Sequence, residues 1–330
     1  MNQISHSLQS ETIIDWLLAQ NKPWVTLNTY LDLLDRPVDS PEVRAAYKSL
    51  RHDEQVATIL DEAQVWPQAT RLKKAYDPKD TLWKLAILAD FGLKRDDELI
   101  QAVAQKVLDL LAGDPHPPGF LHGGFDHTRG WDERPYICIS HVMTYALARF
   151  GYLDDPRVQA AYDCLESWQT HDGGWHPNEK NRPGGVQENE PSCPFGTVNI
   201  LRAISANPAL RDSPIAERAV ENVLTLWQRR AEPYRPVGFG MGTTFNKLQY
   251  PFVQHQLLKT VDTLSNFPSA LQDERFVEMV TAVTAKQSPD GTFTTEGINK
   301  PYAGFDFGQK KQPSAWITFL VVRTQHRLGS

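Results

Sequence analysis

The stretch EPSCPFGTVNILRAI, residues 190–204, is an apolar helical pattern led by a proline, and similar patterns occur six times along the chain. Proline suits the first position of a helix because its fixed φ matches the helix and its missing N–H would have no partner there. The leading prolines, spaced by 55, 57, 56, 60 and 62 residues, are Pro23, Pro78, Pro135, Pro191, Pro251 and Pro313. Self-similarity at a nearly fixed period indicates a repeat architecture.

Each proline-led segment except the last is followed by a polar turn and a second helical pattern, in which apolar and charged positions alternate as on a surface helix. Six such hairpins in a ring would give six inner helices sheathed by six outer helices. The amphipathic segment SETIIDWLLAQ, residues 10–20, has no partner and would close the ring beside the last inner helix, around Trp316. The sequence therefore predicts an all-α fold, a single (α/α)6 toroid domain over residues 1–330.

The composition of the chain argues against several classes of function. The formal net charge of the 330 residues is -6 without a basic stripe, which argues against nucleic acid and against an anionic membrane surface. No apolar run is long enough for a membrane span, and the first residues lack the pattern of a secretory signal. Three cysteines do not suggest a disulfide framework. We expect a cytoplasmic protein that binds a small molecule, and a partner subunit is left open.

A motif that occurs twice in the chain resembles the signature of a known family. The segment LESWQTHDGGW, residues 165–175, resembles the Q-x-x-D-G-G-W repeat of squalene cyclases and protein prenyltransferases, and VTAKQSPDGTF, residues 283–293, is a second copy. The resemblance implies a divergent single-barrel member of the terpenoid cyclase and prenyltransferase superfamily, an enzyme acting on an apolar or isoprenoid-like molecule in the central cavity. Within the motif, Gln169, Asp172 and Trp175 are expected to cap and pack helices, and Trp175 is also a candidate ligand platform.

The segment DPKDTLW, residues 77–83, resembles the D-x-D-D-T acid motif of class II terpene cyclases. Lys79 stands where that family has the proton-donating aspartate. A cation there is expected to keep Asp77 and Asp80 ionised, which predicts against standard class II cyclisation. The alternative role of the two aspartates is to cap the helix that follows.

A zinc site is suggested by resemblance to the β subunits of protein prenyltransferases, which bind zinc through an Asp-x-Cys pair and a histidine about one repeat later. The candidate ligands here are Glu190, Cys193 and His255, the last 62 residues after the cysteine. Carboxylate, thiolate and imidazole are all zinc ligands. The alternative is that Cys193 is a small apolar core residue.

Four long links, residues 113–134, 172–190, 232–248 and 289–311, precede inner helices, so function is predicted at the end where those helices begin. Counted from the repeat starts, one layer would contain Thr29, Lys84, His141, Thr197, His255 and Phe319. The candidate catalytic residues are Asp126, His127, Asp132, Glu133 and His141. The candidate substrate-binding residues are Lys84, Arg129, Trp131, Trp175, His176, Phe239, Tyr250 and Phe305. The alternative for His141 is a hydrogen-bonded core histidine.

Two other functions stay open at this point. Barrels of this kind also form carbohydrate-active enzymes, glycosidases or lyases, which use paired carboxylates and aromatic platforms, and others are noncatalytic binding or scaffold proteins. A deep apolar pocket would favour the isoprenoid function, a wide groove with aromatic walls the sugar function, and a filled centre the scaffold.

Overall fold

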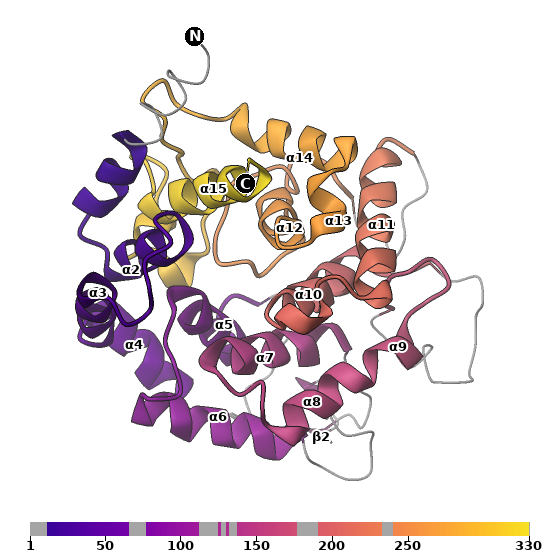
Figure 1. Cartoon of the computed structure of the whole chain (residues 1–330), viewed down its shortest axis with the longest axis horizontal. Coiled ribbons are helices and arrows are strands. Elements are labelled where there is room, and N and C mark those ends of the chain that lie inside the picture. The colour runs from indigo at the N-terminus through magenta and orange to yellow at the C-terminus, as the bar shows by residue number, and fades with distance from the viewer. Residues whose placement is uncertain are drawn as a thin grey trace.

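The inner wall of the protein is a closed ring of helices (Figure 1). The computed structural model describes residues 12–65, 77–111, 125–126, 130–131, 137–176, 191–232 and 240–329. Each inner helix contacts the next one in the chain, and the last contacts the first. The six are α2 (Pro23–Asp32), α5 (Thr81–Phe91), α7 (Ile137–Phe150), α10 (Pro194–Ser205), α12 (Leu257–Leu264) and α15 (Ala315–Leu328). The predicted all-α toroid is confirmed.

Outer helices cover this ring (Figure 1). They are α3 (Pro41–Arg51), α4 (Glu54–Ala63), α6 (Glu98–Leu111), α8 (Pro156–Asp163), α9 (Leu165–Trp168), α11 (Pro214–Gln228) and α14 (Glu274–Thr284). A helix over residues 12–19 buries Ile13 and Leu17, and the Ile13 side chain lies next to Gly291 in the link that leads to α15. No helix in the described ranges is long and apolar enough to cross a membrane.

The first repeat has two outer helices where the sequence pattern indicated one. Asp53 explains the additional helix, because its carboxylate accepts hydrogen bonds from the backbone N–H groups of Gln55 and Val56 at 2.9 and 3.1 Å and so begins α4. The remaining described elements are short: α13 (Pro268–Leu271), η2 (Pro208–Leu210), η4 (Lys300–Tyr302), η5 (Asp306–Gly308), and the antiparallel strands β1 (Phe125–Asp126) and β2 (Gly130–Trp131).

The prolines mark the repeats better than they mark the helix starts. Pro23 is the first residue of α2, but α12 begins six residues after Pro251, and α15 begins after Ser314, whose hydroxyl accepts from the Ile317 N–H at 3.2 Å. Proline is compatible with extended backbone as well as with a helix, so the capping side chain decides where the helix begins.

The first signature copy joins neighbouring repeats. The Gln169 side chain donates to the carbonyls of Gly173 and, at the start of α11, Ile215, at 2.8 and 2.9 Å. Asp172 accepts from the Ser192 N–H at 2.9 Å, just before α10. Gly173 has φ +87°, and a Cβ there would lie 2.3 Å from a backbone oxygen, so only glycine fits. The motif therefore fixes an outer helix to the next hairpin.

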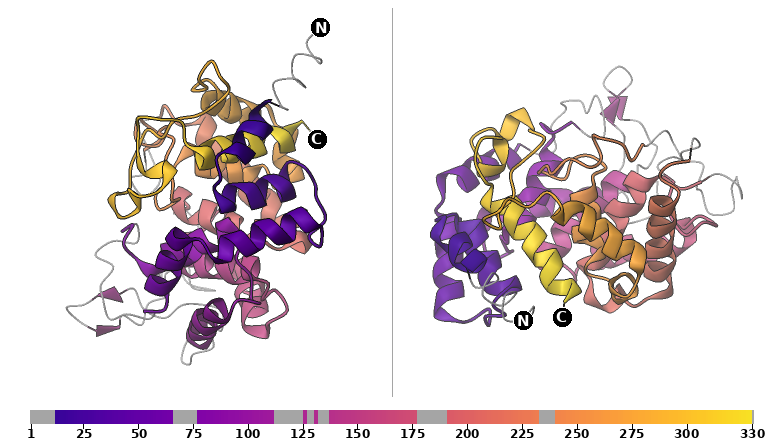
Figure 2. Two further views of the ribbon diagram at one scale, coloured as in Figure 1. Left: turned by 90° about the vertical axis from the view of Figure 1, so that its left-hand side faces the viewer. Right: turned by 90° about the horizontal axis from the view of Figure 1, so that it is seen from above.

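Aromatic side chains pack together between α2, α5, α15 and two of the links. Trp24 stacks on Phe91 with ring centroids 4.8 Å apart, and Phe305 stacks on Phe307 at 5.0 Å. Tyr250 meets Phe307 edge-on at 4.8 Å. This part of the interior is filled by protein side chains. The inner helices end at one edge of the ring, and the links that lead into their starts lie at the opposite edge (Figure 2).

Candidate functional site

Much of the predicted site lies outside the described residues: His127, Arg129, Asp132, Glu133, Glu190 and Phe239. Asp126 and Trp131 are described by their backbones only. They belong to the two-strand ladder, in which Phe125 lies opposite Trp131 and Asp126 opposite Gly130. The catalytic and binding roles assigned to these residues stay predictions.

The predicted layer does not face one cavity. His141 is fully buried, and its Nε2 lies 3.2 Å from the carbonyl oxygen of Ala161 on the outer helix α8. Lys84 forms an ion pair with Glu62 on the outer helix α4, with Nζ 2.6 Å from the carboxylate. Both side chains thus contact the outer wall of the barrel. Lys84 and His141, which hold the same position in their repeats, therefore both point outward from their helices.

Two of the proposed zinc ligands, Cys193 and His255, have surroundings that favour their neutral forms. Burial raises the pKa of Cys193 to about 11, and its sulfur accepts the Gly196 N–H at 3.4 Å as a helix cap. Burial, with a further contribution from Lys259, lowers the pKa of His255 to about 3, and its ring packs on Phe245 at 4.7 Å. The described ranges contain no group of three metal-ligating side chains. Zinc binding stays a prediction.

The remaining predicted ligand-binding residues are mainly part of the core. Trp175 is fully buried and donates its indole N–H to the Leu165 carbonyl at 3.0 Å. Tyr250 is fully buried and donates its hydroxyl to Asp90 at 2.7 Å. His176 is 7% exposed. Phe305, at 8% exposed, does border a cavity, as does Lys84.

That cavity, here called the rim groove, has a volume of about 690 Å³ and lies between α4, the start of α5 and residues 300–305. Glu62 and Lys84 form one part of its wall, and Ile59, Tyr302 and Phe305 supply apolar surface. The Tyr302 hydroxyl donates to the Pro78 carbonyl at 3.0 Å, which ties the 300–305 segment to the residues preceding α5. The groove is thus assembled from parts of the chain that are distant in sequence.

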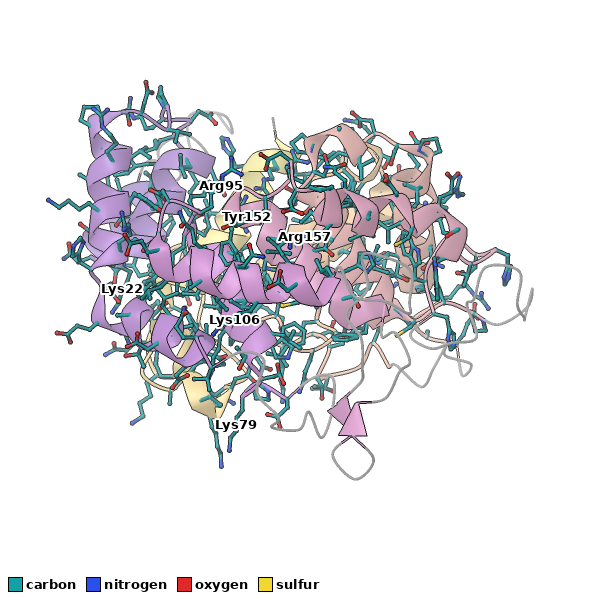
Figure 3. All side chains as sticks on the ribbon, turned by 90° about the horizontal axis from the view of Figure 1, so that it is seen from below. Lys22, Lys79, Arg95, Lys106, Tyr152 and Arg157 are labelled. Carbon is teal, nitrogen blue, oxygen red and sulfur yellow. The ribbon has the colours of Figure 1, made fainter. Side chains whose placement is uncertain are left out.

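Asp80 is not itself a lining residue of the rim groove, but it follows Lys79, which is one, and it caps α5 by accepting the Leu82 N–H at 2.9 Å. Burial, with a smaller contribution from Asp77, raises the pKa of Asp80 to about 6, although Lys84 opposes the shift. The expectation that Lys79 lowers this pKa is wrong. Lys79 is an exposed lining residue of the rim groove and extends toward solvent (Figure 3), so water screens its charge while burial acts on the Asp80 carboxyl. The expected capping role is confirmed for Asp80, whereas Asp77 accepts the N–H of Lys79, which precedes the helix, at 3.0 Å.

A second cavity, which the sequence analysis missed, lies at the opposite end of the barrel, where the inner helices end. It has a volume of about 440 Å³ and is called here the arginine cavity. Its charged lining residues are Asp32, Asp90, Arg149, Arg202, Arg211, Asp262, Arg323 and Arg327. A signal for it exists in the sequence, because every inner helix carries a charged residue near its C-terminal end within an apolar pattern.

Two arginines of this cavity are neutralised by its three aspartates. Arg202 pairs with Asp90, which also accepts the hydroxyls of Tyr145 and Tyr250 at 2.6 and 2.7 Å. Burial and Asp90 raise the pKa of Tyr145 to about 12, although Arg202 opposes them.

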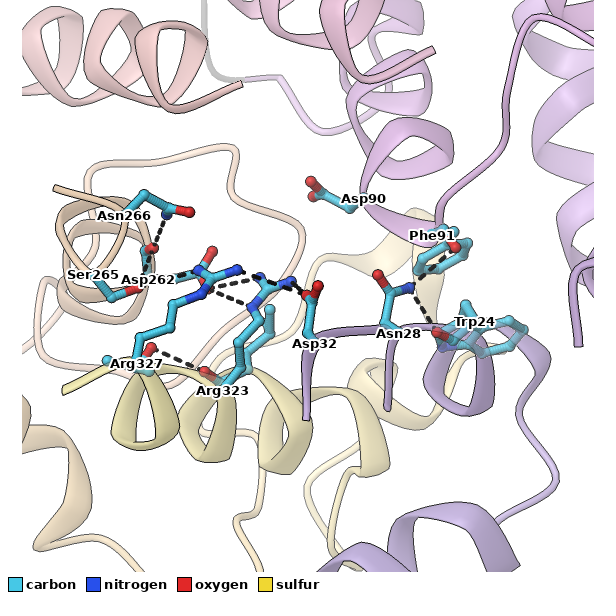
Figure 4. A network of polar contacts seen from close by, with 12 residues as sticks. Trp24, Asn28, Asp32, Asp90, Phe91, Asp262, Ser265, Asn266, Arg323 and Arg327 are labelled. Atoms are coloured by element: carbon cyan, nitrogen blue, oxygen red, sulfur yellow. Dashed lines mark hydrogen bonds and ion pairs between the residues drawn. The ribbon is translucent and has the colours of Figure 1, made fainter. Parts of the chain in front are cut away.

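Arg323 bridges the other two aspartates, with nitrogen atoms 2.6 Å from Asp262 and 2.8 Å from Asp32 (Figure 4). Burial alone would raise the pKa of Asp32, but Arg323, Arg327 and Arg149 lower it.

No protein-family model and no curated protein matches the chain. Among solved structures, the chain is similar to the type II terpene cyclase MstE from Scytonema, at 15% identity over 99% of this chain and 98% of that chain, with a TM-score of 0.45. It is also similar to a polysaccharide lyase, at 11% identity over 98% of each chain and TM-score 0.45. A protein from Actinoplanes is 14% identical over 98% of this chain and 99% of that chain, with TM-score 0.42.

Proposed function

We propose that the protein is an enzyme that acts on a largely apolar, isoprenoid-like small molecule in the rim groove, with Asp80 as the proton donor. The observation that carries this proposal is the position of the Asp80 carboxyl, next in sequence to Lys79 on the wall of a groove that also contains Tyr302 and Phe305; burial raises the pKa of this carboxyl to about 6. A general acid works best when its pKa lies near the working pH, and a mostly apolar cavity with a few polar groups is typical of a ligand site.

The groove offers distinct surfaces to the two parts of such a reaction. The apolar faces of Ile59, Tyr302 and Phe305 suit the body of the molecule. Burial, Glu62 and Asp80 all raise the pKa of the Tyr302 hydroxyl, and Lys84 lowers the pKa of Asp80, which supports a position of the acid near this surface. Aromatic rings also stabilise a positive charge above their faces.

The proposed step is protonation of a carbon–carbon double bond. The Asp80 carboxyl gives its proton to one alkene carbon, so that a C–H bond forms, the π bond breaks and the other carbon becomes a cation. Loss of a proton from a neighbouring carbon to water or to the Asp80 carboxylate then restores a double bond at a new position. No oxidant or reductant is needed.

A carbohydrate-active enzyme is the second candidate, because Glu62 supplies another carboxylate at the same groove. Glu62 forms an ion pair with Lys84 at 2.6 Å, and burial favours the protonated form of Asp80. Glycoside hydrolysis uses a pair of carboxyl groups that flank the scissile bond.

The test is turnover of a C20 linear polyprenyl alcohol in D2O, with products analysed by mass spectrometry. The expected product is an isomer that carries one deuterium on carbon, and Asp80→Asn should reduce its rate by about 10²–10⁴-fold. Asp77→Asn is the matched control, because Asp77 precedes the same helix and should retain most of the activity. Release of nitrophenol from nitrophenyl glycosides, dependent on Glu62, would instead identify the carbohydrate function. Absence of turnover and of binding for both substrate classes would contradict an enzymatic groove.

The raised pKa of Asp80 also predicts how stability depends on pH. The folded state binds its proton more tightly than the unfolded state, whose pKa is near 3.8, so this group lowers stability as pH rises from about 4 through about 6. Asparagine is an equally good helix cap without a charge. Asp80→Asn should therefore be more stable than wild type at pH 8, by on the order of 1–3 kcal/mol, and equal to it near pH 4. Urea denaturation at both pH values measures this, and a difference independent of pH would contradict the assignment.

A further inference from the structure

We infer that the arginine cavity binds a small polyanion, a molecule carrying phosphate or carboxylate groups, through Arg149, Arg211 and Arg327. This site lies at the other end of the barrel from the rim groove and does not depend on the proposed enzymatic function. Its volume of about 440 Å³ falls within the range of small-molecule pockets.

The arginine cavity holds more cations than anions. The lining contains five arginines and three aspartates, and Arg202 and Arg323 already make the close pairs with those aspartates. Arg327 lies 3.7 Å from the Asp32 carboxylate, which it shares with Arg323, and donates to the Ser265 hydroxyl at 3.2 Å. Arg211 donates to the backbone carbonyl of Ser205 at 2.8 Å. Within the described part of the chain, no carboxylate pairs with Arg149 or Arg211.

The cations of this cavity lie close enough to repel one another. Burial lowers the pKa of Arg327 to about 10, and Arg323 lowers it further, ahead of the opposing effect of the aspartates. Burial and the charge of Arg149 also lower the pKa of Arg211. Cations that are held together in a partly buried space repel one another, and an anion between them would remove that cost.

Two polar groups that line the cavity have unused hydrogen-bonding capacity. Among the described residues, the buried Nε of Arg149 has no hydrogen-bond partner, and neither does the buried hydroxyl of Thr263, which also lines the cavity. Buried donors are normally satisfied, so each such group needs a partner. The planar guanidinium matches the paired oxygens of phosphate and carboxylate groups. The chemistry of the lining therefore selects an oxyanion.

The competing explanation is structural. Six inner helices end at this side, and each helix end carries a partial negative charge that arginines complement. The contact of Arg211 with Ser205 is of this kind. Under that explanation, removing an arginine lowers stability whether or not an anion is present. Under ours, removing one relieves repulsion in the ligand-free protein and weakens anion binding.

The experiment measures the melting temperature of the full chain while diphosphate, phosphate or citrate is titrated at constant ionic strength, with chloride as the reference salt. A bound anion stabilises the folded state by mass action, so Tm should rise with its concentration. Arg149→Gln and Arg211→Gln should each raise the apparent Kd at least tenfold, while the Tm without added anion stays equal to or above that of wild type. Arg44→Gln, on the exposed surface of α3, is the matched control and should behave as wild type.

The three probes also separate the sources of the oxyanion. Stabilisation by diphosphate or phosphate would identify a phosphate-bearing ligand, and stabilisation by citrate alone would identify a polycarboxylate. The inference is overturned if no probe raises Tm beyond chloride. It is also overturned if the two cavity variants lose stability without added anion and keep the wild-type response to it.

Discussion

Replacing Arg202 by Met is expected to lower the free energy of unfolding by about 3–5 kcal/mol. Arg202 is 5% exposed, pairs with Asp90, and lies over the ring of Tyr145 at 4.1 Å. Methionine fills much of the same volume but leaves the Asp90 carboxylate buried with only two tyrosine hydroxyls as partners. An uncompensated buried charge costs far more than the pair contributes when it is intact.

Urea denaturation measures this loss, and Arg95→Met supplies the control. Arg95 pairs with Asp154 at 2.9 Å, but both side chains are more than half exposed. Arg95→Met should therefore lower the free energy of unfolding by less than about 1 kcal/mol. Adding Asp90→Asn to Arg202→Met should recover part of the stability, because the orphaned charge is then removed. Equal losses for the exposed and the buried arginine would show that Asp90 is not held as a buried ion.

Trp175→Ala is expected to cost about 3–5 kcal/mol of stability. The indole is fully buried, and its N–H is bonded to the Leu165 carbonyl at 3.0 Å, so alanine leaves both a cavity and an unpaired carbonyl. The Trp175 backbone N–H is held as well, by the Thr197 hydroxyl on α10 at 3.1 Å. The signature thus supports the joint between two repeats.

Trp175→Phe should lower the stability less than Trp175→Ala does, because most of the side-chain volume remains and chiefly the indole hydrogen bond is removed. His171→Ala, on the exposed side of the same turn, should change the stability by no more than about 0.5 kcal/mol. Calorimetry on the three variants checks this order. If Trp175→Ala abolished ligand binding at unchanged stability, Trp175 would have to be reassigned as a ligand platform.

The ring could be predicted from the sequence because its cause is periodic. A proline-led apolar segment recurs every 55–62 residues, and only stacking of such hairpins buries that surface. Helix starts could not be read from the prolines, because capping residues such as Asp53 and Ser314 set the boundaries. Local side-chain chemistry outweighed the repeat spacing there.

The candidate sites were harder to predict for a geometric reason. The spacing placed Lys84 and His141 in one layer, but spacing alone does not say which face of a helix looks inward, and both contact outer helices. The predicted lowering of the Asp80 pKa by Lys79 is wrong because Lys79 is exposed, whereas its neighbour Asp80 is partly buried. The sequence signal for the arginine cavity is the set of single charged residues near the ends of the inner helices, such as Arg202 within NILRAI.

The bridge made by Arg323 has a consequence for how the chain assembles. It joins α15 to α12 and, across 291 residues, to Asp32 at the end of α2. Contacts between segments so distant in sequence form late, because the intervening chain must first be brought to order. During synthesis, α2 can pack against α3 early, but its contact with α15 must wait until residues 315–328 have left the ribosome. The early repeats therefore spend most of translation as an open arc, the state in which exposed apolar surface invites aggregation and chaperone binding.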